Sequence, residues 1–448
     1  MMRLITRFTD FLRRILPSPF TIAVLLTYLT FALALWLTPV KHPGEPHLFE
    51  LAGFWAKGFW ELLGFSMQMM LMLVLGYVLA LTKPVNRLIQ IMTNYADTMP
   101  KAAFLVTFLT LVFSFLNWGL GLIFGAVFAR KVGEDFSKRK QAFNYPLIGA
   151  AGYAGLMVWH GGLSGSAPLK IAEKGHFLVD KIGVIPLNET IFSHMNLVVS
   201  LTLLIVLPLV MMWAAKKGEK QKIVLKELSE KAVDEHPENP TGADKLDYSR
   251  GFALFLGVVF LFTSVYLAVK AGNLGFINLN YINFSLFTLG ILLTPNVAVF
   301  QDFVSKSIRA ASGILIQFPL YAGIMGLMKY SGLFLVFTDA FVHISSPVLL
   351  PVNTLFSAGL VNFFVPSGGG QWAVQGPVIV EAAKHLGVSI PKVVMALAYG
   401  DEWTNMLQPF WALPLLGITG LKARDIVPYT FLLFLCGGVI FIAGLLLF

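Results

Sequence analysis

Long runs of hydrophobic residues dominate the chain, and most of them contain no charged residue. A helix that crosses a bilayer needs about 20 such residues, and runs of that length recur throughout the sequence. They predict ordinary spanning helices at Pro17–Val40, Leu62–Thr82, Ile191–Ala215, Gly251–Val269, Gly272–Gln301, Ala310–Met328 and Ile426–Phe448. The pattern therefore predicts an all-α polytopic membrane protein.

Four other apolar stretches are interrupted by clusters of glycine, proline and polar residues. The interruptions fall at Asn117–Gly119, Trp159–Pro168, Val365–Gln371 and Gly400–Pro409. Inside a helix, glycine costs about 1 kcal/mol and proline about 3 kcal/mol. The backbone groups that a break sets free cannot face lipid, so broken backbone must face protein or a watery cavity. We expect the functional site at these breaks.

Composition and charge agree with the membrane class. Hydrophobic residues make up 56% of the chain and charged residues only 13%, against about 25% in soluble proteins. The net charge of +9 comes from Lys and Arg that cluster near the N-terminus and between hydrophobic runs. The positive-inside rule places these clusters and the N-terminus in the cytoplasm, with the chain in the bacterial inner membrane. The lipid bilayer is therefore the expected partner, and nucleic acid is not. The single cysteine, Cys436, predicts no disulfide framework.

This orientation predicts two re-entrant hairpins, Ala102–Ala129 from the cytoplasm and a second near Pro351–Val380 from outside. As two full spans, either hairpin would have arms of only about 14 residues, which are too short to cross. One order of elements then runs twice: helix, interfacial stretch, hairpin, broken helix and closing helix. Landmarks recur at a spacing of 245 residues: Asn117 with Asn362, Gly125 with Gly370, Pro146 with Pro391, and Gly155 with Gly400.

We therefore predict inverted repeats with two re-entrant hairpins, two broken transmembrane helices and about nine spanning helices. The predicted segments are 1–58 (N-terminal cytoplasmic segment, first transmembrane helix and periplasmic loop), 59–215 (first inverted repeat), 216–250 (cytoplasmic linker), 251–306 (connecting transmembrane helices) and 307–448 (second inverted repeat).

Paired interrupted helices in inverted repeats indicate a secondary transporter with its site near the membrane midplane. Freed carbonyls and side-chain oxygens suit Na⁺, which we expect near Asn117 and Asn362, and half-helix N-termini attract a carboxylate. Alternatively, the glycines only allow close helix packing. The first candidate site comprises Asn117, Gly119, Gly121, Ser164 and Ser166, and the second Asn362, Ser367, Gly368, Gly369, Gln371, Thr404 and Asn405.

Asp401 and Glu402 are adjacent acidic residues inside a predicted span. A carboxylate within the membrane is by default a functional hypothesis. The pair could relay protons, help bind a cation, or be paired and structural. Successive helical residues point about 100° apart, so we expect only one of them, Asp401, to face the site. His160 in the first break is either a proton relay or a structural, hydrogen-bonded histidine.

The motifs at the breaks resemble those of the bacterial short-chain fatty acid transporter family. They are Asn117–Leu122, Trp159–Pro168, Val361–Trp372 and Gly400–Trp411, and the resemblance covers essentially the whole chain. It implies a transporter of butyrate- or acetoacetate-like acids in the ion transporter superfamily, whose members often work as dimers by an elevator motion. The dicarboxylate branch of that superfamily carries Ser-Asn-Thr triplets at its hairpin tips, and this chain has no complete triplet there.

The leading interpretation is thus a homodimeric secondary carrier of small monocarboxylates, coupled to H⁺ or Na⁺ and needing no other cofactor. No Arg falls inside a predicted break, which favours a monocarboxylate. The alternatives are a carrier of another small organic anion such as a dicarboxylate, an anion channel, and an intramembrane enzyme using His160, Asp401 and Glu402. HEXXH, P-loop and GxSxG motifs are absent from the sequence, so we do not expect an enzyme.

Overall fold

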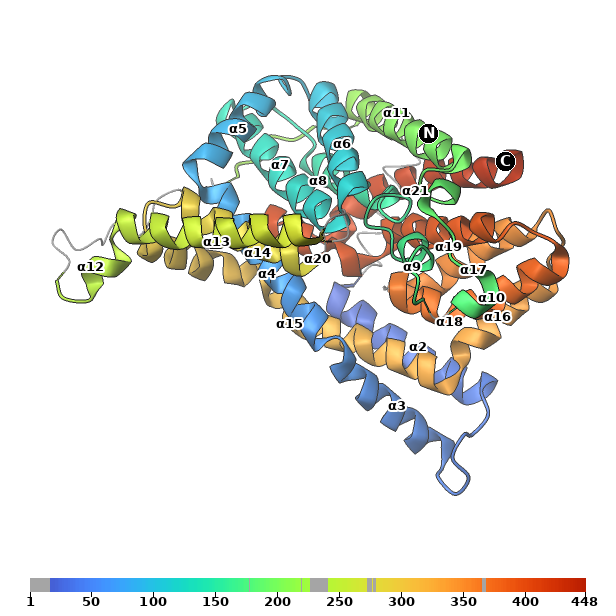
Figure 1. Ribbon diagram of the computed structural model, residues 1–448. Coiled ribbons are helices and arrows are strands. Elements are labelled where there is room, and N and C mark those ends of the chain that lie inside the picture. Colours follow the sequence, from blue (N-terminus) through green and yellow to red (C-terminus); the bar gives the residue numbers. More distant parts are fainter. Residues whose placement is uncertain are drawn as a thin grey trace.

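The computed structural model describes residues 17–176, 178–218, 220–225, 241–271, 276, 279–364 and 368–448. These parts of the chain are helical apart from turns and one isolated bridge between Phe143 and Gln221 (Figure 1). Seven helices in them are long and apolar enough to cross a membrane: Phe20–Leu37, His47–Leu81, Met99–Leu116, His194–Lys217, Arg250–Ala271, Ala311–Ser331 and Ala423–Leu447. The predicted class, an all-α polytopic membrane protein, is confirmed.

One set of helices, the peripheral group, packs around the long helix α15. α13 and α14 lie together at one side of it, and α3 extends away from the rest of the molecule beside α15 (Figure 1). The peripheral group comprises α2 (Pro19–Leu37), α3 (His47–Glu61), α4 (Leu63–Leu81), α13 (Arg250–Ala271), α14 (Leu279–Leu293) and α15 (Val297–Ser331).

The other set, the central group, contains all four interrupted stretches. Its first half comprises α6 (Met99–Leu116), α7 (Trp118–Lys138), α8 (Tyr145–Tyr153), the 3₁₀ turn η1 (Ala154–Met157), α9 (Ser166–Ile171), α10 (Val179–Ile182), η2 (Leu187–Glu189) and α11 (His194–Lys217). Its second half comprises α17 (Leu350–Phe364), α18 (Gly368–Leu386), α19 (Ile390–Thr404), the 3₁₀ turn η4 (Asn405–Leu407), α20 (Pro409–Thr419) and α21 (Ala423–Leu447). Short helices α5 (Lys83–Asn94), α12 (Asp244–Asp247) and α16 (Leu333–His343) complete the described elements.

The first hairpin turns at Asn117, whose backbone is extended between α6 and α7. Its arms lie against each other, since Gly121 on α7 faces Ser114 on α6 and Gly125 faces Thr110. The arms have 18 and 21 residues, so the predicted length of about 14 was wrong. The helices continue past the uncharged stretch because Glu134 pairs with Arg130 at 2.8 Å and with Lys131 at 3.4 Å.

Corresponding positions in the two halves make matching contacts. A methyl group added to Gly155 in η1 would lie 2.9 Å from Ser114 Cβ on α6. Exactly 245 residues later in both cases, one added to Gly400 on α19 would lie 3.0 Å from the Gly359 nitrogen on α17. In each half, therefore, the first arm of a hairpin lies directly on a broken helix, with glycine allowing the close approach.

Two predicted elements differ in the structure. The expected span Gly272–Gln301 ends at Leu293, because Pro295 has no N–H to donate and Asn296 accepts a hydrogen bond from the Val299 N–H, which starts α15. The expected loop before residue 58 contains α3 instead. There the buried Glu50 carboxylate accepts hydrogen bonds from the backbone N–H groups of Lys41 and His42, so this charged side chain is not left without partners in the helix. Residues 226–240 of the predicted linker lie outside the described residues.

Candidate functional site

The first break and the end of α19 meet in the centre of the molecule. The irregular segment 158–165 follows η1, so the break begins at Ala154, earlier than the predicted Trp159. The second predicted break was also misplaced: Gly400–Thr404 is helical, and the interruption is Asn405–Gln408. Gly400 does not break α19 because its missing side chain serves close packing against α17.

His160 and Asp401 form a buried pair across this junction. The ring atom Nδ1 of His160 lies 2.6 Å from Asp401 Oδ2, and both side chains are at most 1% exposed. The backbone N–H of Ala167 donates to His160 Nε2 at 3.1 Å, so Nε2 must carry a lone pair. The ring is therefore neutral with its hydrogen on Nδ1, which donates to the Asp401 carboxylate.

Glu402 binds the backbone of the same segment. Its Oε2 accepts hydrogen bonds from the His160 N–H at 2.8 Å and the Gly161 N–H at 3.4 Å. That only Asp401 faces the substrate site stays a prediction, but both acidic residues contact the segment at the first break. Although the side chains leave α19 in different directions, Asp401 reaches the imidazole ring and Glu402 reaches the main chain beside it.

The N-terminus of α18 closes the cluster from the second hairpin. A methyl group added to Gly368 would lie 2.7 Å from His160 Cε1, 2.9 Å from Trp159 Cη2 and 3.1 Å from Asp401 Oδ2. One added to Gly369 would lie 3.8 Å from Ser166 Cβ, an ordinary contact. A small apolar core, which includes Ala167, Trp372 and Leu397, holds α9 against α18 and α19. Both broken segments and one hairpin thus converge on His160 and Asp401.

The first hairpin joins the cluster through Ser164. Its hydroxyl accepts a hydrogen bond from the Trp118 N–H at 3.0 Å. Asn117 Oδ1 accepts from the N–H groups of Gly119 and Leu120 at 3.0 and 3.1 Å, and so caps α7. Because that oxygen already has two donors, Na⁺ at this tip would have to draw on other atoms. Gly121 serves packing against Ser114.

Asn362 has a different role from Asn117. It lies within α17, not at a break, and its Nδ2 is 2.7 Å from the Asp401 carbonyl oxygen, 3.0 Å from Thr404 Oγ1 and 2.9 Å from Asn405 Oδ1. The Gln408 side chain donates to the Asn362 carbonyl oxygen. The oxygens Asn362 Oδ1 and Gln408 Oε1 are buried and have no hydrogen-bond partner. The two asparagines therefore do not occupy the equivalent places that the repeat predicts.

One other predicted residue, Gln371, falls outside this arrangement. Gln371 bonds to the Ala358 carbonyl oxygen and to Gln375, which holds the arms of the second hairpin together. Ser367 lies outside the described residues. Sequence reasoning missed Asn196, whose Nδ2 donates to the carbonyl oxygens of Gly161 and Ile191 and whose Oδ1 accepts from the Tyr399 hydroxyl. An asparagine in an otherwise apolar span was the available signal.

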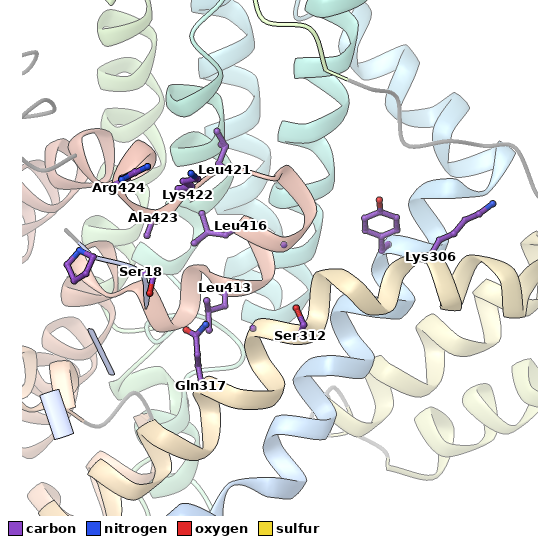
Figure 2. A pocket seen from close by; sticks show the side chains of 14 residues that line it. Ser18, Lys306, Ser312, Gln317, Leu413, Leu416, Leu421, Lys422, Ala423 and Arg424 are labelled. Atoms are coloured by element: carbon purple, nitrogen blue, oxygen red, sulfur yellow. The ribbon is translucent and has the colours of Figure 1, made fainter. Parts of the chain in front are cut away.

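A large cavity lies away from this cluster, at the seam between the peripheral and central groups. It has a volume of about 780 Å³ and is bounded by α15 on one side and by α20 and the start of α21 on the other (Figure 2). We call it the basic cavity, and its lining includes Lys306, Ser312, Gln317, Leu413, Leu416, Leu421, Lys422 and Arg424. His160 and Asp401 do not line it, and both of their side chains are buried.

Comparison with known proteins supports a transport role. Two relatives are provisionally named short-chain fatty acid transporters. One from Escherichia coli K12 is 41% identical over 99% of both chains, and one from Haemophilus influenzae Rd is 37% identical over 98% of both. Solved structures of the Alcanivorax borkumensis YdaH transporter (TM-score 0.43, 95% of this chain and 98% of that one) and the Neisseria gonorrhoeae efflux pump MtrF (TM-score 0.36, 98% and 97%) share 14% identity. Likeness this distant carries no functional inference.

The whole chain, residues 1–448, matches the family model described as "Short chain fatty acid transporter". With the relatives aligned from end to end, this match shows that the protein belongs to the short-chain fatty acid transporter family.

Proposed function

We propose that this protein is a secondary active carrier that takes up short-chain fatty acids, of the butyrate and acetoacetate kind, together with protons. The observation that carries the proposal is the buried His160–Asp401 pair, at 2.6 Å, against the N-terminus of α18. A helix N-terminus attracts a carboxylate through its free N–H groups and its dipole. A short acid bound at Gly368 and Gly369 would lie beside Asp401.

Charge explains why binding there needs a cation. Two unit negative charges about 4 Å apart repel by about 4 kcal/mol at an effective dielectric constant of about 20. A proton taken up by the His160–Asp401 pair removes this repulsion, so proton and substrate each favour binding of the other. Charging His160 also puts a hydrogen on Nε2, which ends its hydrogen bond with the Ala167 N–H. Protonation would thereby loosen the start of α9.

The side chains at the cluster favour one carboxylate over two. His160, Ser164, Ser166, Asp401 and Glu402 include no fixed cation that could pair with a second negative charge. The same geometry argues against an intramembrane enzyme. His160 Nε2 accepts from a backbone amide and is not in position to activate a hydroxyl group.

The oxygens around Asn362 carry the alternative of Na⁺ coupling. Asn362 Oδ1 and Gln408 Oε1 are buried without partners, close to the carbonyl of Asp401 and the hydroxyl of Thr404. Hard cations such as Na⁺ prefer oxygen ligands of this kind. A Na⁺ ion here would offset the charge of Asp401 without protonating it.

The same proposal includes the architecture inferred from the sequence: inverted repeats, a re-entrant course for both hairpins, and an elevator-type homodimer in the bacterial inner membrane with a cytoplasmic N-terminus. Supporting it are the matching contacts of Gly155 and Gly400 and the recurring order of elements. α4, α5, α6–α7, α8–α9 and α11 are followed in the second half by α15, α16, α17–α18, α19–α20 and α21.

The test is uptake of labelled butyrate and acetoacetate into proteoliposomes, with pH and Na⁺ gradients imposed separately. One proton per substrate and a gradient of one pH unit, worth 1.36 kcal/mol, should give about tenfold accumulation. Asp401→Asn should abolish this accumulation and partly keep counterflow, whereas Asp180→Asn, which alters an exposed carboxylate in the short helix α10, should behave like the wild type. Undiminished accumulation in Asp401→Asn would remove Asp401 from coupling.

The other arms separate the rival functions. Accumulation driven by a Na⁺ gradient alone would assign coupling to Na⁺, for which the oxygens around Asn362 are the candidate ligands. Uptake without trans-stimulation would indicate an anion channel, and inhibition by succinate at butyrate-like concentrations would favour a dicarboxylate carrier.

A further inference from the structure

The basic cavity combines cationic, polar and apolar walls. Lys422 and Arg424 lie at one end, with Ser18 beside them, and Lys306 lies at the other (Figure 2). Leu413, Leu416 and Leu421 supply an apolar wall. Its volume of about 780 Å³ lies within the range of about 300–1,000 Å³ typical of ligand pockets. Such a space is suited to an amphipathic anion considerably larger than a four-carbon acid.

The charges are strongest at the Arg424 end. Lys306 forms an ion pair with Asp302 at 2.7 Å, so the charge at that end is largely balanced. At the other end, the two cations Lys422 and Arg424 outnumber the carboxylate of Asp425, which accepts a hydrogen bond from the backbone N–H of Lys422 at 3.1 Å. Arg424 stands in the first turn of α21, a helix of 25 residues whose N-terminus adds positive potential. Behind the Leu421 wall, Arg130 donates to the Thr419 carbonyl oxygen, and Arg130, Lys131 and Glu134 together carry one net positive charge.

A polar anchor lies on the opposite wall. The buried Oε1 atom of Gln317 on α15 has no hydrogen-bond partner, and its side chain points toward α20 in Figure 2. Leaving a buried amide oxygen without a hydrogen-bond donor is unfavourable, and a ligand that carries a hydroxyl group would supply the missing donor. The hydroxyl of Ser312 lies on the same helix, one turn and a half before it.

We propose that the basic cavity binds an anionic phospholipid, with its phosphate at Lys422 and Arg424, its head-group hydroxyl at Gln317 and its acyl chain along the three leucines. Basic pockets between transmembrane helices are suited to anionic lipid head groups. Because Gln317 belongs to the peripheral group and Arg424 to the central group, the bound lipid joins the two groups. The proposal is independent of the transported substrate and the coupling ion.

The experiment uses the full-length protein, delipidated in a neutral detergent, with phosphatidylglycerol, phosphatidylcholine and inorganic phosphate as separate probes. Native mass spectrometry counts bound lipid, and titration gives its affinity. We expect one phosphatidylglycerol per chain, bound at least tenfold more tightly than phosphatidylcholine. The double variant Lys422→Gln/Arg424→Gln should lose that preference, whereas Lys216→Gln/Lys217→Gln, at the end of α11 and outside the cavity, should keep it.

A second variant keeps the proposal testable if the double variant fails to fold. Gln317→Leu removes the anchor and keeps the charges, and should weaken phosphatidylglycerol at least threefold while leaving inorganic phosphate binding unchanged. Equal affinity for both lipids, full retention in both cavity variants, or phosphate binding as tightly as the lipid would overturn the proposal, the last result by assigning the cavity to a soluble anion.

Discussion

Gly368→Ala tests the candidate site by adding a single methyl group to it. In the structure that carbon would lie 2.7 Å from His160 Cε1, 2.9 Å from Trp159 Cη2 and 3.1 Å from Asp401 Oδ2. Non-bonded carbon atoms are normally about 3.5–4.0 Å apart, so the imidazole ring must retreat by roughly 0.8 Å. That shift is enough to lengthen the 2.6 Å hydrogen bond between His160 and Asp401 beyond useful range.

The loss in binding can be worked out from the hydrogen bond alone. A hydrogen bond to a charged group contributes about 1.5–3 kcal/mol. Overpacking of a filled interior, about 1–3 kcal/mol, lowers the stability of the fold, and normalising to folded protein removes its effect on yield. A loss of about 2 kcal/mol in binding the proton and substrate together corresponds to roughly 30-fold. We therefore expect the rate of proton-driven butyrate uptake to fall by about 10- to 50-fold.

Gly369→Ala is the matched control, since it makes the same change one residue later in the same turn. Its nearest neighbours would be Ser166 Cβ at 3.8 Å and Ser166 Oγ at 4.0 Å, and the backbone N–H remains. Replacing glycine by alanine in a helix is favourable by about 1 kcal/mol, so this variant should lose far less activity. Uptake in proteoliposomes, normalised to folded protein from size-exclusion chromatography, compares the two. Gly368→Ala uptake within twofold of the wild type, or equal losses in both variants, would refute the reasoning.

Three further substitutions test the contacts around the cluster. Asn362→Ala removes the donor to Asp401 O, Thr404 and Asn405, so we expect about 3 kcal/mol lower stability and a fall in both folded yield and uptake; a normal yield would show that these bonds contribute little. Ser164→Ala removes the hydroxyl that accepts a hydrogen bond from the Trp118 N–H and should lower the free energy of unfolding in detergent by about 1 kcal/mol. Ser193→Ala removes the N-cap of α11 and serves as the reference, because the loss of a helix cap costs about the same. Asn196→Leu removes the hydrogen-bond partner of the Tyr399 hydroxyl and of two carbonyl oxygens, so the free energy of unfolding should fall by about 3 kcal/mol. The midpoint temperature of thermal unfolding should fall with it, and an unchanged midpoint would contradict the buried network.

Run length and residue type predicted the helical class and the existence of the first hairpin. Asn117, Trp118 and Gly119 interrupt an uncharged run, and the backbone does turn there. Helix ends were harder to predict. Gly400 was expected to break its helix, but a glycine in contact with the backbone of another helix has the same sequence signature as a glycine at a break. Only the position of Gly359 on the neighbouring helix distinguishes the two cases.

The pairing within the site could not be derived from the sequence. His160 and Asp401 are separated by 241 residues, and both stand in motifs that equally permit a structural role. Which atoms meet depends on the route of the chain between them, including the backbone amide of Ala167 that fixes the imidazole tautomer. The bonds of Glu402 to the same backbone were missed because helical spacing describes where side chains leave a helix and not how far they reach.

The contacts at Gly155 and Gly400 also determine which parts of the molecule can slide. Gly155 packs against the side chains of Ser114 and Thr110, and Gly400 packs against the backbone of α17. Such close-packed contacts resist small displacements. We therefore expect each hairpin to move together with its own broken helix. Freedom for a change of shape remains at the seam between the peripheral and central groups, where the basic cavity leaves part of the facing surfaces of α15 and α20 out of contact and Phe318 stacks on Phe410 beyond it. Spin labels on opposite sides of that seam should change their separation during turnover, and labels flanking Ser114 and Gly155 should keep a constant distance.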